Sequence, residues 1–228
     1  MEMTIFYTVL LFIAAYLMGA PLGYYLVKLK TRKDIRADFR DVGGSSSSGA
    51  TNVKRALGIR WALFAAFCDY LKGAAPTAIA IALLWGTHWV VGLLGLVSLL
   101  GNLFPVLVSK PRFKGGKGVA TTGGALTPMV AISLINYHPL WLLLLFAVII
   151  LLWGIFVWIL RRENHKWMVL ASAFLVSAMI LFFGIMEART YPAFVFSVYL
   201  MGIIVLCAHF ENWVKLKNHF TRQKSPGI

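Results

Sequence analysis

The chain has 228 residues, of which 60% are hydrophobic and 13% are charged, and its formal net charge is +14 at pH 7. A mean hydropathy of +0.78 excludes an ordinary soluble domain, and the basic excess indicates helices in lipid with loops that meet anionic partners. Nucleic-acid-binding domains are also basic, but they do not carry repeated long apolar runs, so no nucleic-acid partner is expected.

Seven apolar stretches are each long enough to form a transmembrane helix, which needs about 20 residues to cross the hydrocarbon core. They cover residues 4–29, 60–85, 88–108, 118–137, 139–160, 166–185 and 191–208. The sequence therefore predicts an all-α protein, a polytopic transmembrane bundle of seven helices. We expect one membrane domain over residues 1–216 and a short basic cytoplasmic tail over residues 217–228.

The basic residues determine the expected orientation of this bundle. All Lys and Arg residues except Lys72 and Arg189 fall in the tail or in the first, third and fifth loops with their flanks, all on the same side of the membrane. Because cytoplasmic loops carry an excess of Lys and Arg, this side is expected to be cytoplasmic. The N-terminus then lies outside and the C-terminus inside, as an odd number of helices requires.

The first loop contains a run of Gly and Ser over residues 43–49, which is followed by Thr51, Asn52 and Arg55. These three polar side chains can donate several hydrogen bonds to an oxyanion, and a loop of this length tends to be functional or disordered. The pattern is therefore a candidate phosphate-binding segment. The alternative interpretation is a flexible Gly/Ser linker without a binding role.

The second predicted helix carries two ionisable residues, Asp69 and Lys72, which are three positions apart and so share one helical face. Ionisable residues in a membrane helix are costly and usually face the bundle interior or a wet cavity. Either Lys72 extends an anion-binding site, or it forms a structural ion pair with Asp69 near the interface and reaches toward water.

The third loop contains a segment rich in Gly and Lys that leads directly into the fourth predicted helix. Glycines allow the backbone to turn its N–H groups toward an anion, and the start of a helix adds further free amides. The alternative is an ordinary basic cytoplasmic turn. No strand precedes the segment, so it is not a Walker A loop. The candidate phosphate-binding residues are Lys114, Gly115, Gly116, Lys117 and Gly118.

Two polar groups lie nearer the C-terminus. Arg161 belongs to a basic cluster between the fifth and sixth predicted helices, which either sets topology and contacts lipid headgroups or lines the rim of an anionic site. At the end of the last helix, His209 is a candidate general base or oxyanion donor, and Asn212 is a candidate ligand for a substrate hydroxyl. The alternative for His209 is a polar residue tolerated at the membrane interface.

Several known types of active site are missing from the sequence. No His is followed at the fifth position by Asp, and no Gly-x-Ser-x-Gly segment occurs. Cys68 and Cys207 lie in apolar stretches, and the Cys and His residues do not have the spacing of metal ligands. We therefore expect neither a disulfide framework, nor a metal, nor a cofactor.

Taken in order, the polar segments resemble the motifs of the acyl-phosphate-dependent glycerol-3-phosphate acyltransferases of bacteria, the PlsY family. The resemblance runs from about residue 5 to residue 216, and its most specific part is the unbroken match over residues 113–121. Asn102 stands where this family has a motif histidine. The shorter matches are Gly49-Ala50-Thr51-Asn52 with Arg55, Asp69 with Lys72 and Gly73, Gly101 with Phe104 and Pro105, and His209 with Asn212.

The resemblance implies transfer of a fatty acyl group from acyl phosphate to the 1-hydroxyl of glycerol 3-phosphate, which gives lysophosphatidic acid and begins phospholipid synthesis. It implies a multi-pass protein of the bacterial plasma membrane with its active site on the cytoplasmic face. Ser45, or Ser46 beside it, would correspond to the essential serine of the family. The alternatives are a transporter or channel for a phosphorylated solute and a diverged family member with another acceptor.

Overall fold

The computed structural model describes residues 2–19, 25–26, 29–30, 49–84, 88–104, 116–137 and 192–209. Within these residues the regular structure is entirely α-helical, which confirms the predicted fold class for the described part of the chain. Its helices are α1 (Glu2–Met18), α4 (Ala50–Leu57), α5 (Ile59–Leu83), α6 (His88–Leu103), α7 (Val119–Tyr137) and α10 (Pro192–Ala208).

Five of the predicted membrane helices coincide with α1, α5, α6, α7 and α10. The predicted helices over residues 139–160 and 166–185 lie outside the described residues, so the number of seven stays a prediction. Helix α4 was not predicted and falls in the first loop. In the described ranges, none of the helices combines the length and the apolar character that a membrane crossing requires.

Helix α1 ends well before residue 29, the predicted end of the first membrane helix. The N–H of Gly19 donates to the carbonyl of Tyr16 at 3.1 Å, which closes the helix with a tight turn. Gly19 also lies against the backbone of Gly101 in α6, where any Cβ would collide. Pro21 follows two residues later and disfavours a helical continuation. Apolar composition alone did not reveal this boundary.

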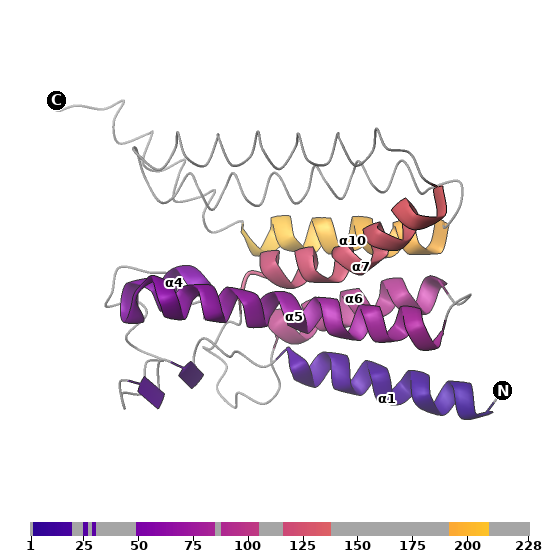
Figure 1. Cartoon of the computed structure of the whole chain (residues 1–228), viewed down its shortest axis with the longest axis horizontal. Helices are drawn as coiled ribbons and strands as arrows, with labels where there is room; N and C mark the ends of the chain where they lie inside the picture. Colours follow the sequence, from indigo (N-terminus) through magenta and orange to yellow (C-terminus); the bar gives the residue numbers. More distant parts are fainter. Residues whose placement is uncertain are drawn as a thin grey trace, which may run out of the picture.

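The long helices lie roughly along one axis, with α5 in the middle of the molecule (Figure 1). The C-terminal end of α1 packs on that of α6 through Gly19 and Gly101. The start of α7 contacts the C-terminal ends of both α6 and α10, because Gly118 lies against Leu99 and near Val205. Three helix C-termini and one helix N-terminus therefore meet at the same end of the bundle.

Helices α5 and α7 touch backbone to backbone. A Cβ at Gly73 would collide with the carbonyl oxygen of Thr121, and one at Gly124 would collide with the carbonyl oxygen of Tyr70. Small residues are typical of such close helix contacts in membrane proteins. The two glycines fix the first turn of α7 against the middle of α5, beside Lys72.

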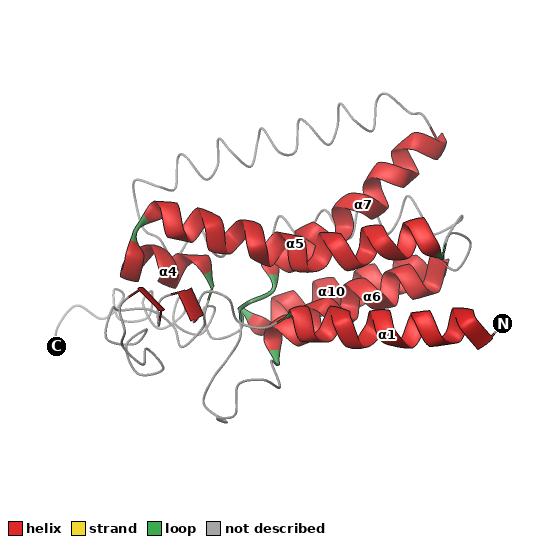
Figure 2. Ribbon diagram, turned by 60° about the horizontal axis from the view of Figure 1, so that its bottom comes forward, coloured by secondary structure: helices red, strands yellow, loops and turns green. Residues whose placement is uncertain are grey.

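Helix α4 folds back along the first half of α5, and both figures place it at the end of the molecule where α5 begins (Figures 1 and 2). Gly58 joins the two helices with a φ of 88°, a conformation that favours glycine. Val53 of α4 is fully buried in a small apolar cluster with Ala65 and Trp61 of α5. Thr51, Lys54 and Arg55 of α4 are exposed, whereas Asn52 is buried.

Candidate active site

The segment Gly116-Lys117-Gly118 forms the turn that enters α7. Gly118 has a φ of 81°, and a Cβ there would also collide with the side chain of Leu99, so only glycine fits this position. Gly116 is buried against Asn102 at the end of α6, where an added Cβ would lie 2.9 Å from the amide Nδ2. The C-terminal end of α6 therefore packs against this turn.

The first turn of α7 follows this segment directly. Its hydrogen-bond ladder begins with the N–H of Thr122, which donates to the carbonyl of Gly118 at 2.8 Å. The N–H groups before Thr122 have no acceptor within the helix, and the helix dipole adds partial positive charge at this end. Together with the ammonium group of Lys117, this end of α7 is suited to an anion such as phosphate.

His209 lies directly after α10 and is only 1% exposed. Its ring nitrogen Nδ1 is 2.9 Å from the carbonyl oxygen of Val205. Because a carbonyl oxygen can only accept, Nδ1 carries the proton, and Nε2 of the neutral ring keeps its lone pair. His209 is thus oriented with Nε2 as the basic nitrogen.

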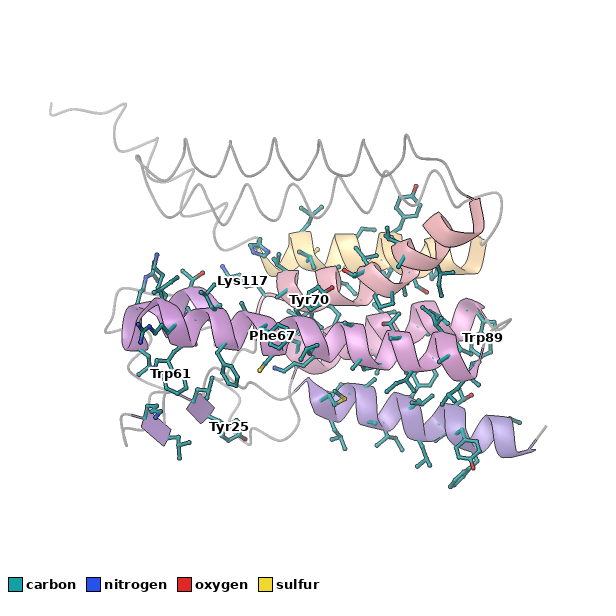
Figure 3. All side chains as sticks on the ribbon, viewed as in Figure 1. Tyr25, Trp61, Phe67, Tyr70, Trp89 and Lys117 are labelled. Carbon is teal, nitrogen blue, oxygen red and sulfur yellow. The ribbon has the colours of Figure 1, made fainter. Side chains whose placement is uncertain are left out.

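The surroundings of His209 favour its neutral form. Burial lowers the pKa of His209 below its ordinary value, and the positive charge of Lys117 lowers it further, whereas the hydrogen bond to Val205 opposes both effects. In Figure 3 the side chain of Lys117 extends from the start of α7 toward the end of the molecule that carries α4. The structure therefore brings His209 and Lys117 into one electrostatic site.

Asp69 and Lys72 form an ion pair inside the bundle. The ammonium Nζ of Lys72 donates to Oδ1 of Asp69 at 2.7 Å, and both residues are buried. The next residue, Gly73, is the one that touches the first turn of α7. The pair therefore lies level with the start of α7. The ion pair that the second alternative predicted is present, but Lys72 is buried rather than reaching toward water.

The candidate residues of the first loop lie on α4. The guanidinium Nη1 of Arg55 donates to Oδ1 of Asn52 at 3.0 Å, and Asn52 is buried whereas Thr51 and Arg55 are exposed. Asn52 thus orients Arg55, which presents its remaining donors to the surface. Five further candidates fall outside the described residues, namely Ser45, Lys114, Gly115, Arg161 and Asn212.

Comparison with known proteins decides the family. A family model described as glycerol-3-phosphate acyltransferase matches residues 9–219. The chain belongs to the glycerol-3-phosphate acyltransferase family. Among the proteins of this family, that of Aquifex aeolicus is 37% identical over 207 residues, which cover 89% of this chain and 91% of the relative. That of Syntrophotalea carbinolica is 36% identical over 217 residues, which cover 95% and 96%.

Two solved structures of the family are similar to this fold. Both are crystal structures of PlsY, an integral membrane glycerol 3-phosphate acyltransferase. Its glycerol 3-phosphate form aligns with a TM-score of 0.68 at 34% identity over 93% of this chain and 92% of that chain. Its lysophosphatidic acid form aligns with a TM-score of 0.66 at 32% identity and the same coverage. The resemblance noted in the sequence is confirmed: this acyltransferase is a membrane protein.

Sequence reasoning did not single out three buried residues beside the candidate site. Asn102 was noted only as a departure from the family pattern, although it packs against Gly116. Thr122 was not singled out, and Thr121 entered only as the last residue of the matched segment; both are fully buried in the first turn of α7. The position of the two threonines could have indicated them from the sequence, because side chains in the first turn of a helix tilt toward the residues that precede the helix. In the described residues, no group of three or more His, Cys, Asp or Glu residues could hold a metal.

Proposed function

We propose that this protein transfers a fatty acyl group from acyl phosphate to the 1-hydroxyl of glycerol 3-phosphate and releases lysophosphatidic acid and inorganic phosphate. The observation that carries the proposal is the meeting of a neutral, oriented His209 with the glycine turn and Lys117 at the start of α7. Family membership and the glycerol 3-phosphate form of the solved relative support the choice of acceptor.

The chemistry requires little beyond positioning and charge. The oxygen of the 1-hydroxyl attacks the acyl carbonyl carbon, the bond between that carbon and the phosphate oxygen breaks, and phosphate leaves. The hydroxyl proton passes to Nε2 of His209 or to the leaving phosphate. Because acyl phosphate is already activated, no covalent enzyme intermediate and no metal are needed. Ser45 and Asn212 are proposed to orient the attacking hydroxyl or to stabilise the developing oxyanion.

Two phosphate groups must be held close together during this reaction. We assign one to the turn at the start of α7, where backbone amides and lysine side chains converge, and the other to α4. Arg55, oriented by Asn52, offers a planar set of donors that suits phosphate, with Thr51 beside it. Lys72 and Arg161 are proposed to add positive charge around the site. The residues proposed for the α7 site are Lys114, Gly115, Gly116, Lys117 and Gly118.

We further propose seven transmembrane helices, a cytoplasmic active site in the bacterial plasma membrane, and a free basic tail over residues 217–228. Many large apolar side chains face outward rather than into the bundle, for example Phe6 at 59% exposure and Leu63 at 63%. Polar residues such as Asp69 and Thr77 are buried instead. Such an inverted distribution suits a protein surrounded by lipid chains.

The decisive experiment gives the purified protein, in detergent, acyl phosphate and glycerol 3-phosphate together. We expect equal amounts of lysophosphatidic acid and inorganic phosphate, with no product when either substrate is left out. A variant with Lys117→Ala is expected to raise the KM for one of the two phosphorylated substrates. Uptake of glycerol 3-phosphate into liposomes without any acylated product would instead identify a transporter.

A further inference from the structure

Two hydroxyl groups in the first turn of α7 are buried without a hydrogen-bond partner. Thr121 and Thr122 are both 0% exposed, and neither Oγ1 has a donor or acceptor within the described part of the chain. Burying a hydroxyl without a partner is unfavourable, and the large majority of buried polar atoms in proteins are paired. Two adjacent exceptions therefore require an explanation.

Other helical hydroxyls of the same bundle show how such groups are normally satisfied. Thr77 donates to the carbonyl of Gly73 at 2.8 Å, Ser98 to that of Leu94 at 2.9 Å, and Thr127 to that of Gly123 at 2.9 Å. Each bond reaches back four residues, as Ser and Thr commonly do inside helices. Thr121 and Thr122 make no such bond.

The position of the two threonines points to the missing partner. Four residues before Thr121 is Lys117, which precedes the helix, so the usual acceptor is not in helical geometry. Four residues before Thr122 is Gly118, whose carbonyl accepts the backbone N–H of Thr122 but no bond from its hydroxyl. Cα–Cβ bonds tilt toward the helix N-terminus, so both side chains lean toward the turn at residues 116–118.

We propose that the hydroxyls of Thr121 and Thr122 are donors to the phosphate group of a substrate bound at the start of α7. A phosphate there would meet the first free amides of the helix, the positive end of its dipole and the charge of Lys117. The hydroxyls add donors from the side of α7 that packs on α5 and α6. This assignment rests on the proposed function, since that function supplies two phosphorylated substrates, acyl phosphate and glycerol 3-phosphate.

The first test compares a double variant, Thr121→Val with Thr122→Val, with the parent enzyme at varied concentrations of each substrate. Val keeps the branched shape and removes the hydroxyl. We expect the KM for one substrate to rise about ten-fold or more, since hydrogen bonds to charged groups are the strong ones. The substrate affected identifies whose phosphate binds there. Thr121→Ser with Thr122→Ser should restore the KM, and values within two-fold of the parent for both substrates would overturn the proposal.

Thr77→Val is the matched control. Thr77 is equally buried, but its hydroxyl is already bonded to Gly73. This variant is expected to lower the melting temperature and leave both KM values unchanged. A rise in KM as large as that of the double variant would mean that any buried Thr→Val change disturbs the site, and it would remove the support for the proposal.

A second readout does not depend on catalysis. Inorganic phosphate is expected to raise the melting temperature of the parent protein in detergent, and this shift should vanish in the Val double variant and return in the Ser one. Without phosphate the Val variant should melt no lower than the parent, since it loses no hydrogen bond. If the protein shows no acyl transfer but phosphate shifts the melting temperatures in this pattern, the phosphate site is supported and the proposed reaction is rejected. An undiminished shift in the Val variant overturns the site. Should the Val variant not fold, Thr121→Ala and Thr122→Ala provide the same comparison.

Discussion

At the scale of single residues, the site depends on groups whose chemical state is set by their neighbours. His209 has its Nδ1 proton fixed by the carbonyl of Val205, and burial and Lys117 keep the ring neutral. Asn52 orients Arg55 in the same way, through one side-chain hydrogen bond. Val205 and Asn52 therefore orient the candidate site residues His209 and Arg55.

The lowered pKa of His209 leads to a prediction on pH dependence. A base must be deprotonated to act, so the acid limb of kcat/KM, which reports groups of the free enzyme, should lie below pH 6.5, the ordinary value for histidine. In the variant Lys117→Met the repulsive charge is gone, so the His209 pKa rises and the limb moves to higher pH. A pH–rate profile measures this, and an identical limb in both proteins would contradict an electrostatic link between the two residues.

The contact between Gly116 and Asn102 predicts a coupled pair of substitutions. Gly116→Ala places a methyl group 2.9 Å from Nδ2 of Asn102, which should displace the turn and reduce kcat/KM. Asn102→Ala removes the obstructing amide, so the double variant should lose less activity than the two single losses combined. A double-mutant cycle on kcat/KM tests this, and strictly additive losses would show that the two residues are not in contact.

The Asp69–Lys72 pair gives a prediction on stability and binding together. Lys72→Met leaves a buried carboxylate without its partner and should cost about 3–5 kcal/mol. Adding Asp69→Asn removes the unpaired charge, so the double variant should melt higher than the single one. If the more stable double variant shows a raised KM for a substrate, Lys72 contributes to substrate binding. An unchanged KM would restrict Lys72 to a structural role.

At the scale of helices, glycine decides which elements approach one another. Helices α5 and α7 meet through Gly73 and Gly124, and α1 meets α6 through Gly19 and Gly101. The first of these contacts positions the start of α7, and the second supports the end of α6, which carries Asn102. The site is therefore assembled by contacts between backbones.

Neighbouring glycines in α7 allow a controlled test of this packing. Gly124→Ala forces a methyl group against the carbonyl of Tyr70 and should destabilise the protein by at least about 1–3 kcal/mol. Gly123→Ala meets nothing within 4 Å, and it should stabilise the helix by about 0.5–1 kcal/mol. Thermal melting in detergent separates the two, and equal effects would show that the helices do not touch at Gly124.

The helices that sequence predicted are those with a strong and long apolar signal, such as α6 and α10. Helix α4 was missed because half of its eight residues are polar and it is too short to give an apolar signal; in the fold it packs on Ala65 and Trp61. The end of α1 was missed because hydropathy does not register a close backbone contact. Both errors arise where tertiary contacts override local composition.

For the candidate site, too, local patterns could be predicted from the sequence whereas tertiary contacts could not. The motif over residues 113–121 predicted a candidate anion-binding turn, and its described part, residues 116–118, forms a turn directly before α7. Interactions between distant segments could not be inferred from one sequence: the charge of Lys117 acts on His209, and Gly116 packs against Asn102. The ion pair of Asp69 with Lys72 was foreseen because both lie on one face of one helix.

At the scale of the whole molecule, the outward apolar surface and the predicted placement of basic residues on one side of the membrane lead to a prediction on topology. A reporter that is active only in the cytoplasm should work when fused after Ile228 and fail when fused before Met1. Reporters active only outside should behave in the opposite way. Activity of a cytoplasmic reporter at both ends would require an even number of membrane crossings and would contradict seven helices.

The glycine contacts between α5 and α7 have a consequence for the thermodynamics of ligand capture. Two backbones that already touch cannot slide past each other without collision, so the amides at the start of α7 keep their directions whether or not an anion is present. An anion that arrives there would spend little of its interaction energy on ordering the receptor. The rate of phosphate release would then depend on the contacts to the anion itself, because no rearrangement of α5 and α7 has to precede it.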